Sequence, residues 1–406
     1  MQVHPQQFQR DGFVILRNVV PEDRLDELRD SFEILVERQK EIWANQRKPG
    51  DPTGGAWETG AQPRLVLNNL VDETTANTVE FCLHENTLGT SRRLMGAPDA
   101  AVTAMLFMCS PVSDHGPARW HRDVGPGHPA PINGLVKNIR HHGPAYVQWN
   151  IALHDDSVLW VVPGSHLRPN TKDEDRQLAE NPQVPLPESI PVELQAGDGV
   201  AYSIPILHWA SNYSTRLRRI IHLGYRAFGG SAFSYVHWRH WDPEFVPHLS
   251  PAARETFQKF DRLWCAEHEI VESIFRTVIQ CDGEMFEKHL VRLHSGETGR
   301  MVCIVMLSKL AFQMQAFDQL EVDHLAPEER DAKFKQHWFG SMLFHNLTSR
   351  FSHSEVSRLC DRFQTLDTKL KLSAIQDAHD FQRGPSEYNC NKMPDDFEVE
   401  DFIASW

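Results

Sequence analysis

Apolar residues at the start of the chain form one short continuous run and then recur every three or four positions. The run GFVILRNVV, residues 12–20, predicts a strand. In the segment after it, the apolar residues that recur at helical spacing are Leu25, Leu28, Phe32 and Leu35. Pro21 stands at the start of this segment, where a helix tolerates proline. We therefore predict a strand followed by an amphipathic helix over residues 21–43.

Between about residues 100 and 228 the pattern changes to short apolar runs that are separated by turn residues. The clearest runs are AVTAMLFMCS (101–110), AYVQWNIAL (145–153), VLWVVPGSH (158–166), VELQAGDGVAYSI (192–204) and RRIIHLGYRAF (218–228). Short strands at such spacing are typical of an antiparallel sandwich or barrel. Residues 48–63 are rich in Gly and Pro and predict a loop.

Beyond about residue 250 the apolar positions return to helical spacing. The residues that mark one helical face over 253–279 are Phe257, Phe260, Leu263, Trp264, Ile270, Val271, Ile274 and Phe275. Helical patterns continue over about 300–320 and 353–381. The chain is therefore expected to be an α+β protein. We divide it into a β-rich domain with an N-terminal helical region (1–230), a helical extension (231–383) and an acidic tail (384–406).

Composition and charge narrow the class of protein. The 406 residues are 41% hydrophobic and 24% charged, which is ordinary for a globular protein. A formal net charge of −14 argues against nucleic acid as a partner, because nucleic-acid binders need a basic surface. The N-terminus lacks the pattern of a signal peptide, and no apolar stretch is long enough for membrane insertion. Seven cysteines without a Cys-x-x-Cys motif fit reduced thiols, so we expect a soluble cytoplasmic protein.

The pattern His-x-Asp occurs three times, and its context differs each time. His154 and Asp156 lie in LHDDS, which predicts a polar turn between strands. His240 and Asp242 lie in an aromatic stretch, YVHWRHWDPEF, where stacking or hydrogen bonding is expected. His121 and Asp123, in ARWHRDVGPGHP, end a predicted strand and open a Gly- and Pro-rich loop. Side chains two apart on a strand share a face, so this third pair can chelate a metal or form a structural hydrogen bond.

A second signal lies downstream, where His208 is followed by a polar bend and then by Arg218 on another predicted strand. If the two regions are neighbouring strands, His208 completes a set of two histidines and one carboxylate with His121 and Asp123. Such a set binds Fe(II) on one face and leaves the opposite positions open, as in non-haem oxygenases. An arginine beyond the distal histidine suits the far carboxylate of a co-substrate, which it can bind with two parallel hydrogen bonds.

Several motifs in a fixed order make the sequence resemble the phytanoyl-CoA dioxygenase family of Fe(II)/2-oxoglutarate-dependent oxygenases over most of residues 8–228. These motifs are DGFVILRNVVPEDRLDELR at the start, WHRD (120–123), WVVPGSH (160–166), AGD (196–198), His208, Asn212 and RLRRIIHLGYR (216–226). The resemblance implies a double-stranded β-helix, or jelly roll. This fold agrees with the short strands that the pattern predicts.

The resemblance also implies roles for individual residues. His121, Asp123 and His208 would hold the iron, and an arginine would form a salt bridge with 2-oxoglutarate. Counting from Asn212 favours Arg218 for this role, whereas counting from His208 favours Arg219; the two face opposite sides of their strand, and we prefer Arg218. An aspartate at position 123, where related halogenases have a small residue, favours hydroxylation or another oxidation over halogenation.

The sequence departs from the family pattern at the second contact to 2-oxoglutarate. Many relatives have a lysine before the metal motif, whereas this chain has Met108 and Cys109. The loop before the PGSH motif is also short. Tyr146, Gln148 and Asn150 alternate along a predicted strand and are candidates for the missing contact, or solvent-facing polar residues. Trp120 and Trp160 are candidates for the pocket wall, or core residues.

The expected function is that of an Fe(II)- and 2-oxoglutarate-dependent dioxygenase, with O2 as the second co-substrate, that hydroxylates an unactivated C–H bond of a small molecule and releases succinate and CO2. Desaturation, cyclisation and demethylation use the same cofactors and remain open. The sequence also leaves open a metal-free jelly roll that acts as a binding or scaffold protein, and a metal-binding cupin without 2-oxoglutarate. The helical extension is expected to buttress the domain, to close over the pocket with residues 233–245, or to form a homo-oligomer.

Overall fold

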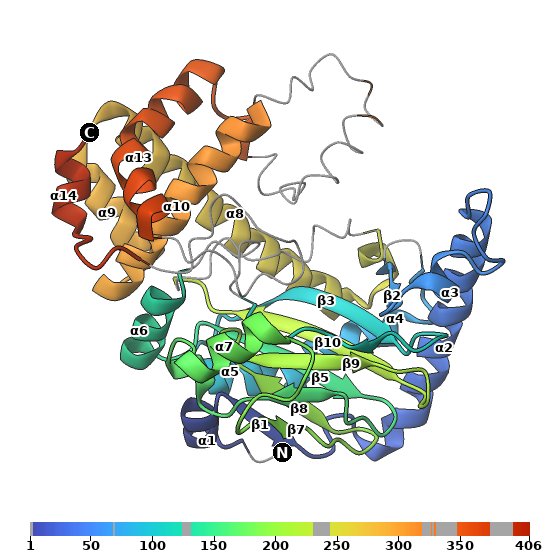
Figure 1. Ribbon diagram of the computed structural model, residues 1–406. Helices are drawn as coiled ribbons and strands as arrows, with labels where there is room; N and C mark the ends of the chain where they lie inside the picture. The colour runs from blue at the N-terminus through green and yellow to red at the C-terminus, as the bar shows by residue number, and fades with distance from the viewer. Residues whose placement is uncertain are drawn as a thin grey trace. The chain divides into compact units, whose positions relative to one another are not determined.

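Two antiparallel sheets form the framework of the first of two compact units in the computed structural model (Figure 1). The structure describes residues 3–67, 70–123, 131–229, 244–318, 326, 329, 347–373 and 393–406. The first unit comprises residues 1–122, 146–227 and 241–260, and the second comprises residues 123–145, 228–240 and 261–406. Buried apolar residues occur in both units.

All the strand pairs in the described part of the chain are antiparallel. The six-stranded sheet consists, in spatial order, of β1 (Phe13–Leu16), β8 (Gly199–Tyr202), β5 (Tyr146–Ala152), β10 (Arg219–Arg226), β3 (Ala101–Cys109) and β2 (Arg64–Leu65). The four-stranded sheet consists of β4 (Gly116–Pro117), β9 (His208–Asn212), β6 (Leu159–Val161) and β7 (Ile190–Pro191). The helices of this unit are α1 (Pro5–Asp11), α2 (Glu22–Asn45), α3 (Ala56–Thr59), α4 (Ala76–Glu80), α5 (Thr90–Met95), α7 (Lys172–Glu180) and the first ten residues of α8 (Pro251–Gln280). The predicted mixture of helices with antiparallel sheets is confirmed.

The two sheets share one apolar core. Ile220 of β10 lies opposite Met108 of β3 and Ala152 of β5 in the strand register. These three residues belong to the same buried cluster as Leu159 and Val161 of the four-stranded sheet. Because side chains alternate along a strand, the residues at every second position from Ile220 also lie on the inner side of the six-stranded sheet.

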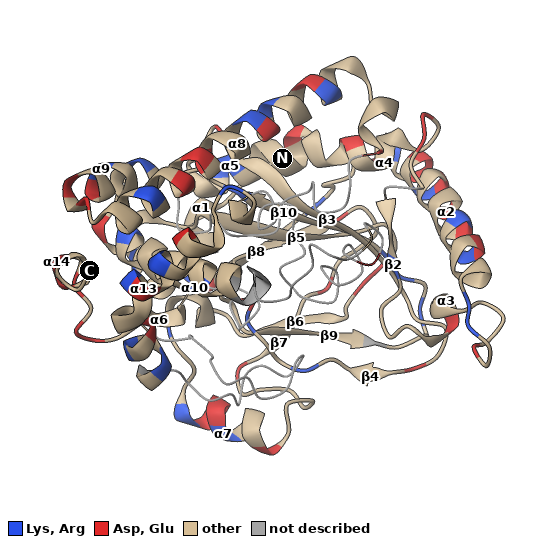
Figure 2. Ribbon diagram, turned by 90° about the horizontal axis from the view of Figure 1, so that it is seen from above, with Lys and Arg blue, Asp and Glu red and all other residues tan. Residues whose placement is uncertain are grey.

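Helices and loops cover the outer side of the six-stranded sheet. Phe32 of α2 stacks on Phe107 of β3 with ring centroids 5.3 Å apart, and the indole N–H of Trp149 donates to Ser91 Oγ of α5 at 2.9 Å. Every residue of β5 and β10 is consequently buried, which explains why their sequences read as continuous runs rather than as alternating ones. Figure 2 shows Lys, Arg, Asp and Glu interspersed along α2, while the strands of this sheet carry few of them.

Two of the motifs on which the family resemblance rests meet in space at Gly12. The Gly12 backbone has φ +81°, and a Cβ there would lie 2.4 Å from Nδ1 of His166. Next to this contact, Gly164 N donates to Asp11 O at 2.8 Å, and Nε2 of His166 donates to Gln9 O at 3.1 Å. The start of the chain and the PGSH turn are therefore packed together through backbone contacts that only glycine permits at position 12.

The second unit is helical in its described part. Its helices are α6 (Ile132–His142), the rest of α8, α9 (Gly283–Leu293), α10 (Glu297–Asp318), α13 (His353–Ser373) and α14 (Val399–Ala404). Helix α6 lies close to α10 at Gly134, where an added Cβ would be 2.9 Å from Val302. Phe402 of α14 contacts the rings of Phe286 and Phe363. None of the described helices has the length and apolar character needed to cross a membrane.

The predicted elements are largely confirmed, and the structure adds several that the apolar pattern did not indicate. The strand at 12–20, the helix at 21–43 and the strand-rich region appear as β1, α2 and β3 to β10. The loop predicted at 48–63 contains the short helix α3. Helix α7 was not predicted, although the capping box of Thr171 and Glu174 at its start is visible in the sequence. The predicted domain bounds at 230 and 383, and most of the aromatic segment 233–245, lie outside the described residues.

Gly12→Ala is expected to destabilise the first unit by about 2 to 4 kcal/mol, because both the positive φ and the clash with His166 oppose a side chain. Gly50→Ala serves as a matched control, since Gly50 has φ +98° but no neighbouring atom within 4 Å of the added Cβ. The control should cost about 1 to 2 kcal/mol, the backbone part alone. Urea unfolding of both variants checks the difference, and equal losses would show that the contact with His166 contributes nothing.

Stability is expected to fall as the pH drops from about 6.5 to about 4, in part because of His166. Burial lowers the pKa of His166 from 6.5 to about 4. Within this window the unfolded chain takes up a proton that the folded chain does not, so the free energy of unfolding decreases with falling pH. His166→Gln should flatten this dependence, as measured by thermal unfolding at a series of pH values. An unchanged slope would contradict the assignment.

Candidate metal centre

His121 and His208 are joined through their backbones. His121 N donates to His208 O at 3.0 Å, and His208 N donates to His121 O at 3.0 Å. This reciprocal pair forms an isolated antiparallel bridge at the beginning of β9. Residues directly opposite each other in an antiparallel pair direct their side chains to the same side, and the two imidazole centroids lie 4.3 Å apart.

The hydrogen bonds of the two imidazoles define which nitrogen carries the proton. Nδ1 of His121 lies 2.9 Å from Arg119 O, and Nδ1 of His208 lies 3.0 Å from Ile206 O. A carbonyl oxygen only accepts hydrogen bonds, so each neutral ring carries its proton on Nδ1 and its lone pair on Nε2. A backbone carbonyl that fixes the ring in this way is the usual outer partner of a metal-binding histidine.

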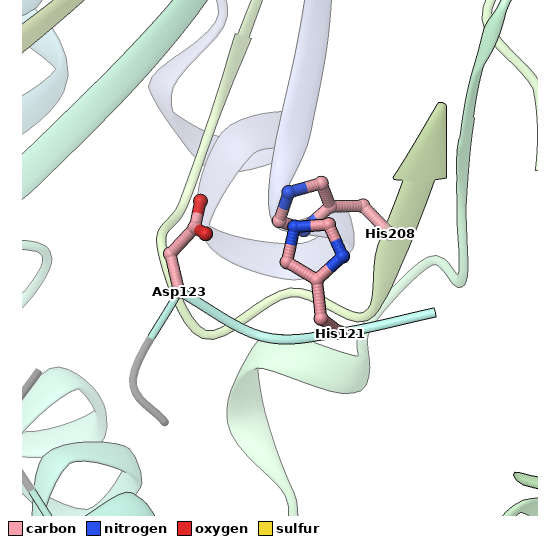
Figure 3. A group of neighbouring side chains, drawn as sticks. All are labelled: His121, Asp123 and His208. Atoms are coloured by element: carbon pink, nitrogen blue, oxygen red, sulfur yellow. The ribbon is translucent and has the colours of Figure 1, made fainter. Parts of the chain in front are cut away.

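Asp123 adds a carboxylate on the same side as the two rings (Figure 3). One potential ligand atom from each of His121, Asp123 and His208 lies within 4.8 Å of the others, and among the described residues this is the group that meets that geometry. Two imidazoles and one carboxylate form the facial set of a mononuclear Fe(II) site with open positions. The donor set therefore fits iron.

Trp120, directly before His121, packs among other tryptophan rings. Its indole N–H donates to Val184 O at 2.8 Å, and its ring stacks on Trp209 with centroids 5.0 Å apart. Trp160 packs edge-on against the same Trp209 at 6.2 Å. Trp120 is fully buried, so these contacts place it in apolar packing.

Arg218 and Arg219 lie on opposite sides of the six-stranded sheet, as the sequence predicted. Arg218 is on the side of Ile220, toward the shared core, and its Nε donates to Asp156 Oδ2 at 2.7 Å. Arg219 is on the outer side, where Nε and Nη2 donate to the two carboxylate oxygens of Glu33 in α2 at 2.6 and 3.0 Å. Both guanidinium groups are buried, but Asp156 is 5% exposed and Glu33 is 43% exposed.

The pair His154 and Asp156 does not form a metal site in the described structure. Asp156 is instead the partner of Arg218, and its Oδ1 also accepts a hydrogen bond from Val158 N at 3.0 Å. The interpretation of this pair as a simple polar turn missed the contact with Arg218, because the two residues are 62 positions apart in sequence. His240 and Asp242 lie outside the described residues.

Gln148, Asn150 and His222 form a polar group on the inner side of the six-stranded sheet. His222 Nδ1 lies 2.8 Å from Asn150 Oδ1, and its Nε2 lies 3.5 Å from Gln148 Nε2. Gln148 is opposite Tyr202 in the register, and the Tyr202 ring lies 5.4 Å from the His208 ring. The polar group therefore adjoins the candidate metal centre through Tyr202.

His222 was not among the site residues predicted from the sequence. The signal for it was present, since His222 stands at the fourth position after Arg218 and shares its face of the strand. Gln148 and Asn150 were predicted correctly to alternate on one strand, and both are buried rather than solvent-facing. Tyr146, on the same face, lies with its hydroxyl 3.5 Å from Thr103 Oγ1.

Two antiparallel sheets and a group of two histidines and one carboxylate define the chain as a protein with a candidate mononuclear metal site. Comparison with known families assigns it further. The model of the phytanoyl-CoA dioxygenase (PhyH) family matches residues 8–220, which is more than half of the chain. The chain belongs to this family, and the resemblance seen in its motifs is confirmed. Family membership and the donor set together support an oxygenase that uses Fe(II), 2-oxoglutarate and O2, as expected from the sequence.

Solved structures of similar fold are distant. The epimerase SnoN from nogalamycin biosynthesis is 18% identical, with 55% of this chain and 81% of SnoN covered and a TM-score of 0.38. EctD from S. alaskensis is 15% identical, with 55% and 75% covered and a TM-score of 0.41. AviO1 from Streptomyces viridochromogenes Tue57 is 19% identical, with 55% and 92% covered and a TM-score of 0.38. No curated protein matches the chain. The family assignment consequently rests on the match over residues 8–220.

Asp156→Ala is expected to lower the free energy of unfolding by about 3 to 5 kcal/mol, because it leaves the buried guanidinium of Arg218 without its counter-ion. Glu33→Ala is the matched control on the neighbouring arginine. Since Glu33 is half-exposed and water can replace it, this change should cost about 1 kcal/mol or less. Chemical denaturation of the metal-free variants measures both. A larger loss for Glu33→Ala than for Asp156→Ala would contradict this assignment of the two pairs.

Proposed function

We propose that the chain is an Fe(II)- and 2-oxoglutarate-dependent dioxygenase whose first unit is a double-stranded β-helix, or jelly roll. His121, Asp123 and His208 are its iron ligands. One observation carries this proposal: in a chain of the phytanoyl-CoA dioxygenase family, these three side chains converge with both Nε2 atoms carrying lone pairs. A metal-free scaffold protein would gain nothing from bringing three such donors together.

Arg218 is the proposed anchor for the distal carboxylate of 2-oxoglutarate. It lies on the inner side of the sheet, and only its Nε is engaged, by Asp156. Within the described part of the chain, its Nη1 and Nη2 make no hydrogen bond. Two terminal nitrogens of a held guanidinium are the donors that a carboxylate binds in parallel. Arg219 is on the outer side and already donates to both oxygens of Glu33, which argues against the same role for it.

Gln148 is the proposed second contact to 2-oxoglutarate, in place of the lysine found in many relatives. It lies on the inner side of the sheet, beside Tyr202 and hence near His208. Its Oε1 is buried and has no hydrogen-bond partner among the described residues. An amide can turn over to present either its oxygen or its N–H₂ group, so Gln148 can donate to a co-substrate oxygen. Trp120, also predicted to contact the cofactor, has contacts that favour a packing role.

The chain's own residues prepare the site for this chemistry. When bound, iron with 2-oxoglutarate and O2 supplies the oxidant that removes hydrogen from a substrate C–H bond, with release of succinate and CO2. His121 and His208 would hold the metal through Nε2, because backbone carbonyls fix the orientation of their rings. Asp123 fills the ligand position that halogenases of this family leave open for chloride, which favours hydroxylation.

The outcome of the oxidation depends on where the substrate lies, so desaturation, cyclisation and demethylation stay open with the same cofactors. A small-molecule substrate is proposed on the basis of the family. The helical second unit is proposed as a buttress or as an oligomerisation surface. A cytoplasmic location and the absence of a nucleic-acid partner stay predictions from the sequence.

An anaerobic titration of the metal-free protein with Fe(II) and then 2-oxoglutarate tests the proposal. We expect the weak visible charge-transfer band that forms when 2-oxoglutarate chelates such an iron. His121→Ala and His208→Ala should abolish metal binding. Arg218→Ala should weaken 2-oxoglutarate binding by about 10- to 100-fold, the range for charged hydrogen bonds. Arg219→Ala, its matched control, should leave this affinity unchanged.

Two results would contradict the proposal. If the wild-type protein binds no Fe(II) and shows no band, the oxygenase function is wrong. If Arg219→Ala weakens 2-oxoglutarate binding and Arg218→Ala does not, the assignment of the anchor is wrong while the iron site stands.

A further inference from the structure

Arg122 lies between the two proposed ligands, where the chain passes from the isolated bridge at His121 to a turn at Asp123. The imidazole and the carboxylate converge, whereas the guanidinium of Arg122 is bound by partners of its own. The mechanism proposed above does not use this arginine. Its partners show what it does instead.

The guanidinium of Arg122 donates to three acceptors on two segments of the first unit, residues 165–170 and Pro205. Nη1 donates to Ser165 O at 2.7 Å and also to Pro205 O. Nε and Nη2 donate to Asn170 Oδ1 at 3.0 and 2.8 Å. All these acceptors are uncharged oxygens. A planar guanidinium with five donors can bind several such oxygens at fixed angles, whereas the ammonium of lysine cannot.

Both segments are connected to His208. Pro205 lies three residues before His208 on the same segment. Ser165, in the PGSH turn, accepts a hydrogen bond from Leu207 N on its Oγ at 2.8 Å. Val162 N, before that turn, donates to Leu207 O at 2.9 Å. The PGSH turn and the residues before His208 are therefore tied to each other, and Arg122 ties both to the segment that carries His121 and Asp123.

We infer that Arg122 is a positioning residue for the metal centre: it sets the spacing between the His121–Asp123 segment and the His208 segment. This inference rests on the proposed function, because it assumes that these three residues bind a metal. The backbone joins the two segments at the His121–His208 bridge, at Ala118 N, which donates to Ala210 O at 2.7 Å, and along the β4–β9 pairing. All these contacts lie at or before His121, whereas Arg122 adds a side-chain attachment beyond it, between the two ligands of this segment.

The expected consequence is a loss of metal affinity without loss of any ligand. Outer partners of metal ligands typically change affinity by about 10- to 100-fold when they are removed. Arg122→Met removes every donor but keeps a long apolar side chain, so we expect a loss in this range. Arg122→Lys keeps the charge but cannot span the three acceptors, so it should also weaken binding.

Arg168 offers a matched control close to Arg122. It forms a bidentate ion pair with Glu174 at 2.7 Å for both hydrogen bonds. Its guanidinium also donates to Pro169 O, and among the described residues neither acceptor lies on a ligand-bearing segment. Arg168→Met should therefore reduce stability but leave the metal affinity of the folded protein unchanged.

The experiment is an anaerobic titration of the metal-free, full-length protein with Fe(II), and with Co(II) as a spectroscopic probe. Both are done well below the unfolding temperature of every variant. Thermal unfolding of the metal-free proteins is measured in parallel. We expect Arg122→Met to raise the dissociation constant of both metals by about 10- to 100-fold and to alter the Co(II) absorption bands. Arg168→Met should shift only the unfolding temperature.

Wild-type metal affinity and unchanged Co(II) bands in Arg122→Met, with a lowered unfolding temperature, would show that Arg122 only stabilises the fold and would overturn the inference. If Arg122→Met does not fold, Arg122→Lys and Asn170→Ala replace it, since Asn170 accepts two of the hydrogen bonds. Wild-type affinity in both would overturn the inference equally. Retained metal binding in His121→Ala and His208→Ala would instead refute the proposed ligands.

Discussion

The candidate site depends on one reciprocal pair of backbone hydrogen bonds, between His121 and His208. Because each residue both donates to and accepts from the other, their side chains emerge on the same side of the strands. The Nδ1 protons are then donated to carbonyls of the same two segments, Arg119 O and Ile206 O. Backbone hydrogen bonds thus bring the two rings to one side and determine which nitrogen each ring presents.

Much of this site could be predicted from the sequence. The two-residue period of a strand predicted the separation of Arg218 from Arg219 onto opposite faces, and the order of the motifs predicted that His208 joins His121 and Asp123. The partners of the arginines could not be predicted, because Asp156 and Glu33 are 62 and 186 positions away in sequence. Such contacts depend on strand order, which no local pattern encodes. His222 lies on a strand that was predicted, but its place in the site was not. Its contacts with Asn150 and Gln148 depend on the register between β5 and β10.

The motifs that carry the family resemblance have a common physical basis in the first unit. Gly12 leaves room for the ring of His166, and Ser165 Oγ accepts a hydrogen bond from Leu207 N. Arg122, between His121 and Asp123, donates to Ser165 O of the same turn. These residues lie far apart in the sequence, yet each contacts the next. The motifs therefore specify less a set of catalytic groups than the scaffold that holds two histidines and a carboxylate in place.

In the proposed 2-oxoglutarate pocket, the arginine that would bind the distal carboxylate is already paired with an aspartate. Arg218 is already neutralised by Asp156, so the protein without co-substrate holds no buried unpaired charge at this point. When the distal carboxylate of 2-oxoglutarate binds, it, Arg218 and Asp156 together carry a net charge of −1. Met108, on the inner side of β3, adds no positive charge near the position where many relatives have a lysine. Neutral hydrogen-bond donors must then provide what a second cation would provide elsewhere. The buried amides of Gln148 and Asn150, beside His222, are the inner-side groups suited to this task.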